Sequence, residues 1–170
     1  EVNGMKMTDA MHEVVGKIGE KIEIKRFATF ASDGVLIEYI HPGSKLGVMV
    51  EIKGVHGGEE VLTLGKDLAM QIAAMNPVAI NRDSVPKEVQ EKELTIYRQQ
   101  AIEQGKAENL IDRIAEGKLN KYFQEYTLLE QSFIRDNTKT VQEHIADIAK
   151  SAGAELSIAR FERFQVGDEK

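Results

Sequence analysis

Three stretches of the chain carry the apolar residues expected of β-strands. Residues 34–41 and 46–53 are apolar runs joined by a glycine-bearing loop, a pattern typical of an antiparallel hairpin. Residues 155–166 predict a third strand of the same sheet. Apolar residues at helical spacing predict helices near 59–75 and 138–152. We therefore expect an α+β fold, in which a small antiparallel three-stranded sheet is covered on one face by these helices.

A repeat relates residues 8–30 to residues 142–164. In both copies, apolar residues at helical spacing are followed by a glycine, Gly19 or Gly153, and then by a strand-like run. The two strand-like runs also share an Arg-Phe pair and a second phenylalanine three residues later. Chance similarity between two helix-to-strand segments is the alternative, but the shared residues favour duplication.

The first copy is preceded by only a few residues. Residues 1–33 are therefore interpreted as the helix and strand of a first core subdomain whose front half is missing. The strand expected at 21–31 could pair with residues 34–41 across the Asp33-Gly34 turn, or it could belong to the missing unit.

Residues 85–130 form an insertion in a second core subdomain, which is expected to comprise residues 34–84 and 131–170. Pro86 suits the first turn of a helix, and Gly105 marks a turn between two helices. This pattern predicts an inserted antiparallel helical hairpin that stands off the core. The residues expected to mediate dimerisation through its apolar face are Val89, Ile96, Tyr97, Ile111, Ile114 and Tyr122.

Composition narrows the class of protein. The 170 residues carry a formal net charge of −6, which argues against direct binding of nucleic acid because affinity for phosphate backbones comes from clustered Lys and Arg. Cysteine is absent, so we expect no disulfide framework, no thiolate zinc site and a cytoplasmic location. No long apolar run or signal peptide is evident, and no membrane contact is expected. Glu1 in place of an initiator methionine suggests a piece of a longer chain.

The sequence contains no strong catalytic or metal-binding pattern. The four histidines have no partner four residues away, so we expect no metal site, no cofactor and no enzymatic activity. A small hydrolase using His41 and Ser44 is a weak alternative, because no third orienting group can be placed. His41 is better suited to contact, since Pro42 and Gly43 restrict and turn the backbone beside it and can hold the imidazole outward.

Several motifs occur in order between Val14 and Gly167. They are Tyr39–Ile52, Asp67–Pro77, Lys87–Glu93 with Tyr97-Arg98, Leu128–Phe133 and Lys139–Val141. As an ordered set they resemble the elongation factor Ts family. The resemblance implies a guanine-nucleotide exchange factor that promotes GDP release from the translation GTPase elongation factor Tu by protein contact. The alternative is a structural or oligomerisation module that acts through the helical hairpin.

The resemblance also implies two contacts with the partner. A histidine at the position of His41, in the loop that includes Pro42 and Gly43, reaches into the nucleotide-binding domain of elongation factor Tu in this family. Ile18 and Gly19, at the junction between helix and strand, are the second implied contact. A core isoleucine before a helix-ending glycine is the alternative reading of that pair.

A third implied contact lies further along the chain. The region of Phe133, Ile134 and Arg135 belongs to the subdomain that grips the third domain of elongation factor Tu, although a buried return strand is equally consistent with these residues. The inserted hairpin is a coiled-coil dimerisation element in some members. The family's Thr-Asp-Phe motif, which presses on the GTPase near its magnesium site, does not occur in this sequence. The chain thus resembles the C-terminal portion of the factor, without the N-terminal helical domain.

Overall fold

The computed structural model describes residues 4–168 and divides between Phe30 and Ala31 into two compact units. The first unit contains one helix, α1 (Met7–Ile18). Gly19 ends this helix in the left-handed conformation, with φ at 77°, and donates its N–H to the Val15 carbonyl at 2.8 Å. None of the twelve α1 residues, all of which the structure describes, is buried.

The strand predicted at 21–31 is wrong. The structure shows no regular element between Gly19 and Gly34, and β1 (Val35–Ile40), which could have paired with such a strand, has β2 as its neighbour among the described strands. An extended segment becomes a β-strand only when a neighbouring strand bonds its N–H and C=O groups. Alternating apolar residues predict the extended conformation, but they do not supply that neighbour.

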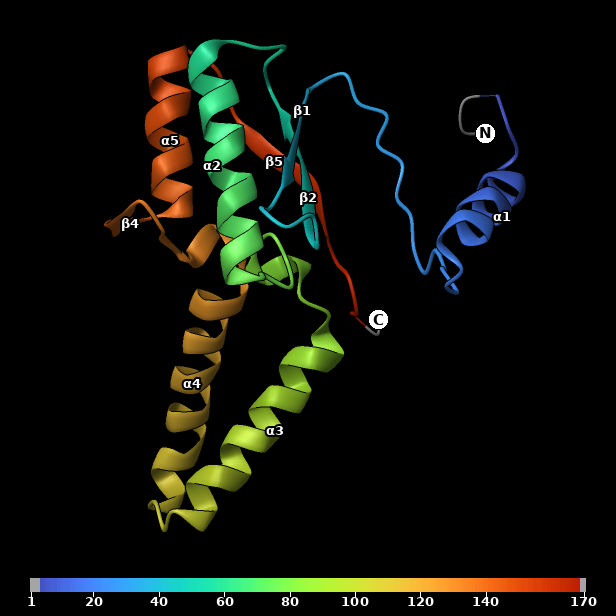
Figure 1. Cartoon of the computed structure of the whole chain (residues 1–170). Helices are drawn as coiled ribbons and strands as arrows, with labels where there is room; N and C mark the ends of the chain where they lie inside the picture. Colours follow the sequence, from blue (N-terminus) through green and yellow to red (C-terminus); the bar gives the residue numbers. More distant parts are fainter. Residues whose placement is uncertain (1–3, 169–170) are drawn as a thin grey trace. The chain divides into compact units, whose positions relative to one another are not determined.

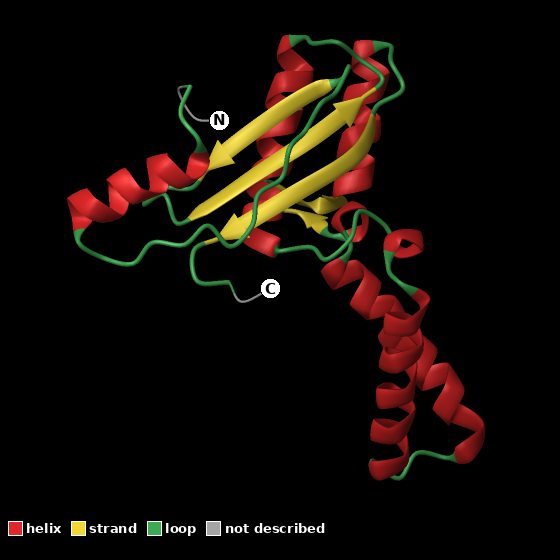
Figure 2. Cartoon of the chain, turned by 90° about the vertical axis from the view of Figure 1, so that its right-hand side faces the viewer, coloured by secondary structure: helices red, strands yellow, loops and turns green. Residues whose placement is uncertain are grey.

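The second unit is built on the predicted three-stranded sheet (Figure 2). Strands β1, β2 (Leu46–Lys53) and β5 (Ser157–Gln165) are antiparallel and lie in the order β1-β2-β5. Val50 at the centre of β2 lies opposite Ile37 of β1 and Phe161 of β5. Because strand side chains alternate between the two faces, this row contributes one layer of the core.

Helices α2 (Glu59–Met75) and α5 (Val141–Ala152) cover one face of the sheet, as predicted (Figure 1). The fully buried apolar residues of this core include Val50, Ile52, Val61, Leu64, Leu68, Ile72 and Val141. Gly65 allows α2 to approach β1 closely, because a Cβ atom at this position would collide with the side chain of Ile37.

The helix predicted at 138–152 begins three residues later, at Val141. Thr140 caps it: its hydroxyl accepts from the Glu143 N–H at 3.2 Å, and the Glu143 carboxylate accepts from the Thr140 N–H at 2.7 Å. The residues before the cap form β4 (Asp136–Thr140), which pairs with the short strand β3 (Ser132–Phe133).

The inserted segment is the predicted helical hairpin, made of α3 (Lys87–Glu103) and α4 (Ile111–Tyr126). The two helices run in opposite directions and stand away from the sheet (Figure 1). Ala101 and Ala115 are completely buried, since small side chains allow the two helices to pack closely. Short 3₁₀ turns flank the hairpin helices at Arg82–Ser84, Glu108–Leu110 and Leu128–Glu130.

The base of the hairpin is fixed to the second unit. The Val78 N–H donates to the Tyr126 carbonyl at 2.9 Å, and the Leu128 N–H donates to the Ala79 carbonyl at the same distance. Arg82 adds a two-pronged ion pair to Glu130, at 2.8 and 2.7 Å. A small apolar cluster of Ala79, Val85 and Phe123 packs beneath these bonds.

Candidate functional site

The loop between β1 and β2, residues 41–45, is exposed throughout. Two main-chain bonds close it, from the His41 N–H to the Leu46 carbonyl and from the Ser44 N–H to the His41 carbonyl, each at 2.9 Å. Gly43 and Ser44 both have positive φ, 91° and 55°, a conformation that glycine adopts at little cost. The loop is therefore a tight turn of defined shape at the end of the sheet.

Tyr39 holds the ring of His41. The phenol oxygen lies 2.9 Å from Nδ1, and the two rings meet edge to face with centroids 6.0 Å apart. Tyr39 also packs against the apolar core, so the pair is anchored at one end and exposed at the other. Because this bond uses Nδ1, Nε2 is the ring nitrogen available to a partner.

Sequence reasoning did not assign Tyr39 to the site. The signal that could have found it is its spacing of two residues from His41, which places both on the same side of an extended strand. The same contact weighs against the hydrolase alternative, because a catalytic histidine is oriented by a carboxylate in the Ser-His-Asp arrangement and His41 is oriented by a phenol.

The second predicted contact region is the turn between β3 and β4. Phe133 is 3% exposed, and its ring stacks on His144 of α5 with centroids 4.1 Å apart. Burial lowers the pKa of His144, which favours the neutral ring. Phe133 thus supports the turn from inside, while Ile134, 42% exposed, is on its outer surface.

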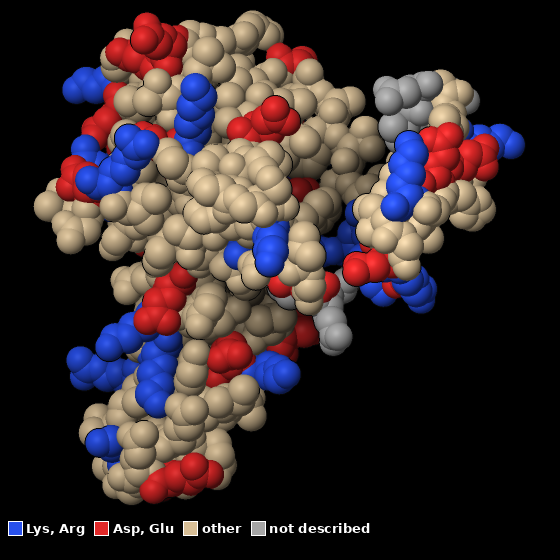
Figure 3. Space-filling view, in the orientation of Figure 1, with Lys and Arg blue, Asp and Glu red and all other residues tan. Residues whose placement is uncertain are grey.

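Arg135 completes the turn with two contacts to α2. Its Nε lies 3.0 Å from the carboxylate of Asp67, a largely buried residue, and its Nη2 lies 3.9 Å from the sulfur of Met70. The surface over the C-terminal half of α2 is largely uncharged in Figure 3. Met75 and Val78, 44% and 53% exposed, contribute apolar area to this part of the molecule. The turn is therefore held in place and offers both apolar and cationic groups.

Ile18 and Gly19 lie at the end of α1, in the first unit. Gly19 is the helix cap that the sequence predicts. Ile18 is 57% exposed, so in this unit it is not a buried core residue, which was the alternative interpretation. Its exposed side chain is available for contact.

The residues predicted to mediate dimerisation have mixed environments within the hairpin. Val89 and Tyr122 pack against the small cluster at its base, and Ile111 and Ile114 are half-buried. Ile96 is 38% exposed. The remaining exposed apolar area comes from residues outside the predicted set, namely Ile102, Leu110 and Tyr126.

Tyr97 belongs to an aromatic cluster inside the hairpin. Burial, followed by the adjacent Glu93 carboxylate, raises the pKa of Tyr97 to about 12. The Lys118 ammonium lies 5.7 Å from the centroid of the Tyr97 ring. Tyr122 and Tyr126 pack together with centroids 4.8 Å apart. The contact of Lys118 with Tyr97 joins α4 to α3, so part of the predicted dimerisation set is used within the hairpin.

The two contact regions of the second unit are separate. The 41–45 loop and β4 lie on opposite sides of α2 (Figure 1), so the structure does not bring them into one cleft. Within residues 4–168 no group of His, Cys, Asp or Glu side chains is arranged to hold a metal ion. None of the described helices has the length and apolar character needed to cross a membrane.

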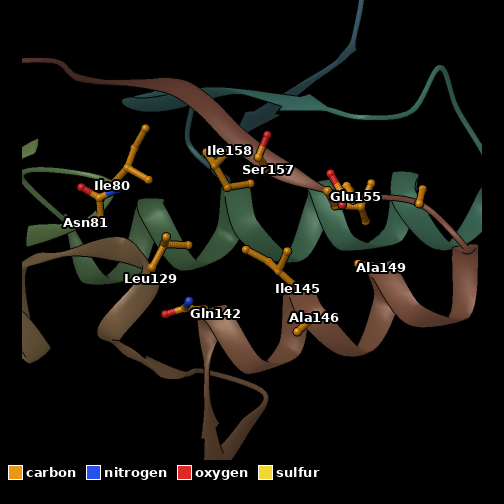
Figure 4. Close-up of a pocket in the computed structure, with 12 residues that line it drawn as sticks. Ile80, Asn81, Leu129, Gln142, Ile145, Ala146, Ala149, Glu155, Ser157 and Ile158 are labelled. Carbon is orange, nitrogen blue, oxygen red and sulfur yellow. The ribbon is translucent and has the colours of Figure 1, made fainter. Parts of the chain in front are cut away.

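A cavity of about 480 Å³ lies between α5 and the start of β5 (Figure 4). Ile145 and Ala149 of α5 and Ile158 of β5 line it, and most of its wall is aliphatic. None of the predicted contact residues lines this cavity. It therefore adds no polar or charged group to the contact regions described above.

Comparison with known proteins identifies relatives along the whole chain. A sequence profile of the family described as elongation factor TS matches residues 1–168. Proteins named elongation factor Ts are 47% identical over 163 residues in Chlorobaculum parvum, 46% over 166 residues in Chlorobium phaeobacteroides and 45% over 167 residues in Amoebophilus asiaticus.

These alignments cover 95%, 97% and 98% of this chain, but 56%, 57% and 58% of the respective relatives. The chain therefore spans a little over half the length of the curated relatives that it matches.

Proposed function

Because the chain belongs to the elongation factor Ts family, we propose that it binds the translation GTPase elongation factor Tu and promotes GDP release by contact. The observation that supports this most directly is the His41 loop. Its backbone is closed by two hydrogen bonds and its imidazole is held by Tyr39. A side chain held in its binding conformation loses little entropy when a partner engages it.

Exchange by contact requires no bond chemistry from this chain. A factor that binds the GTPase better when nucleotide is loosened must, by linkage, lower the affinity for nucleotide by the same factor. In this proposal the exposed His41 ring supplies the contact near the nucleotide. Ile134 and Arg135, on the opposite side of α2, supply the grip that keeps the loop in position.

The missing motif limits the proposed activity. No Thr-Asp-Phe occurs in the sequence, so one of the family's contacts near magnesium is absent from this chain. We expect the chain as it stands to bind elongation factor Tu and to accelerate GDP release less than a factor that contains the motif.

The test is release of a fluorescent GDP analogue from elongation factor Tu, measured with this chain, with His41→Ala and with His56→Ala. His56 is a second exposed loop histidine outside the contact regions. His41→Ala should slow the accelerated release by about tenfold, the effect of losing one central contact, and His56→Ala should leave it unchanged. No binding of the wild-type chain at low salt would overturn the proposal, and release at the rate given by a Thr-Asp-Phe-containing factor would overturn the role of that motif.

We also propose that the hairpin associates with a second copy of the chain. The support is its exposed apolar area, to which Ile96, Ile102 and Leu110 contribute exposures of 38%, 53% and 42%. Sedimentation over a range of protein concentrations tests this, and a monomer at high concentration would contradict it. A cytoplasmic location follows from the proposed partner, since translation takes place there.

A further inference from the structure

Two glutamines are completely enclosed in the second unit. Gln71 of α2 is 0% exposed and Gln131, which precedes β3, is 1% exposed. The Gln71 Nε2 donates to the Gln131 Oε1 at 3.0 Å. Burying an amide is costly unless its polar atoms are hydrogen-bonded. The hydrogen bonds that these two side chains make therefore account for their burial.

Gln71 makes its other bonds to the turn that carries the proposed contact residues. Its Nε2 also donates to the Ser132 carbonyl at 3.2 Å, and its Oε1 accepts from the Ile134 N–H at 2.9 Å. Both atoms of the amide are thus engaged with residues 60 or more positions away in sequence. Through these bonds the backbone of the turn is tied to the middle of α2.

Gln131 connects the same pair to the base of the helical hairpin. Its Nε2 donates to the Glu125 carbonyl in the last turn of α4 at 2.8 Å. The main-chain carbonyl of Gln131 accepts from the Val141 N–H, at the start of α5, at 3.0 Å. The two side-chain amides therefore join α2, the end of α4 and the β3–β4 turn, and the main chain of Gln131 adds a bond to the beginning of α5.

We propose that Gln71 is a positioning residue that holds the Ile134–Arg135 turn in place and ties it, through Gln131, to the base of the hairpin. An apolar side chain of the same size would fill the space without the cost of burying an amide. What it could not do is accept the Ile134 N–H, the bond that adds to the contacts of Phe133 and Arg135 in holding the turn. The proposal rests on the proposed function, because it assigns a role to the turn in binding elongation factor Tu.

The test uses Gln71→Met, which keeps the length of the side chain and removes its hydrogen bonds. The matched control is Gln124→Met, the same change on the exposed side of α4. Amide exchange at Ile134 should become roughly tenfold faster in Gln71→Met, the effect of losing one hydrogen bond, and should not change in the control. Affinity for elongation factor Tu should fall about fivefold in the same variant, while the control binds like the wild type.

Gln131→Met separates the two branches of the network. It leaves the bond from Ile134 to Gln71 in place and removes the link to Glu125, so Ile134 exchange should accelerate by a smaller factor, about threefold. If Gln71→Met does not fold, amide exchange in the wild type still tests the positioning role. The Ile134 amide should exchange at least about tenfold more slowly than in an unstructured peptide. Unprotected wild-type exchange, or wild-type exchange rates in a folded Gln71→Met, would overturn the positioning role.

The two proposals fail in different ways. Absence of binding by the wild type would overturn the proposed function while the exchange rates still report on Gln71. Loss of Ile134 protection with unchanged affinity would show that the turn is positioned but does not contact the partner, and would overturn the role assigned to Gln71 in binding.

Discussion

The phenol oxygen of Tyr39 lies 2.9 Å from Nδ1 of His41, so a residue anchored in the core holds an exposed imidazole. Replacing Tyr39 by Phe keeps the packing of the ring and removes this bond. On the proposed function, stimulated GDP release should slow by about two- to fivefold, in line with the net worth of one exposed hydrogen bond. Tyr126→Phe, the same change on the hairpin, serves as the control. Equal rates for wild type and Tyr39→Phe would show that the partner itself orients His41.

Leu68 is completely buried between α2 and the sheet, whereas Leu62 on the same helix is 43% exposed. Leu68→Ala should lower the free energy of unfolding by about 2–5 kcal/mol, because it removes buried apolar area and leaves a cavity. Leu62→Ala should cost less than about 1 kcal/mol. Urea denaturation measures both, and similar losses for the two variants would contradict the placement of α2 on the sheet.

Thr140 and Glu143 exchange two hydrogen bonds at the start of α5. Thr140→Ala should lower the free energy of unfolding by about 0.5–2 kcal/mol, the usual effect of losing a helix cap. The control is Thr138→Ala, whose hydroxyl also bonds a carboxylate, that of Asp136, but caps no helix. If thermal unfolding shows a larger loss of Tm for Thr138→Ala than for Thr140→Ala, the helix cap at Thr140 would be contradicted.

Glu51 is 3% exposed and accepts hydrogen bonds from Ser32 at 2.5 Å and from Arg160 at 2.6 Å. The Ser32 bond, followed by that of Arg160, holds the pKa of Glu51 below its usual value. A carboxyl whose pKa is lower in the folded state stabilises the fold above its unfolded pKa, about 4.3, and this stabilisation is lost as pH falls through the folded pKa.

Removal of the hydroxyl in Ser32→Ala should therefore lower the Tm most near neutral pH. The difference from wild type should shrink as the pH falls through the lowered pKa of Glu51, because the carboxyl is then protonated in both proteins. Ser151→Ala, at an exposed position on α5, should show no such pH dependence. A difference between wild type and Ser32→Ala that grows as the pH falls would contradict the lowered pKa of Glu51.

Local pattern was sufficient for several elements. The strand predicted at 46–53 and the helix predicted at 59–75 coincide with β2 and α2, because the spacing of their apolar residues is visible in the sequence. The strand predicted at 21–31 has similar alternation and is not formed. The difference is the neighbouring strand, which no short window of sequence can reveal.

The candidate site was visible in part for the same reason. The turn around His41 follows from Pro42 and Gly43, which act on their own backbone. Other features of the site depend on residues that the fold brings together from distant positions. Phe133 is buried against His144, and the Ile134 N–H is bonded to Gln71. The residue types alone do not reveal these contacts, because a phenylalanine can be either buried or exposed.

The sequence by itself determined the α+β class, the helical hairpin and the membership of a translation factor family, because periodicity, turn residues and ordered motifs are properties of the chain. Only the tertiary structure decided which segments find a partner strand, which side chain holds His41 and which buried amides anchor the 133–135 turn. The physical reason is that hydrogen bonds and burial depend on distances across the fold, and segments that lie far apart in the chain meet only when it is folded.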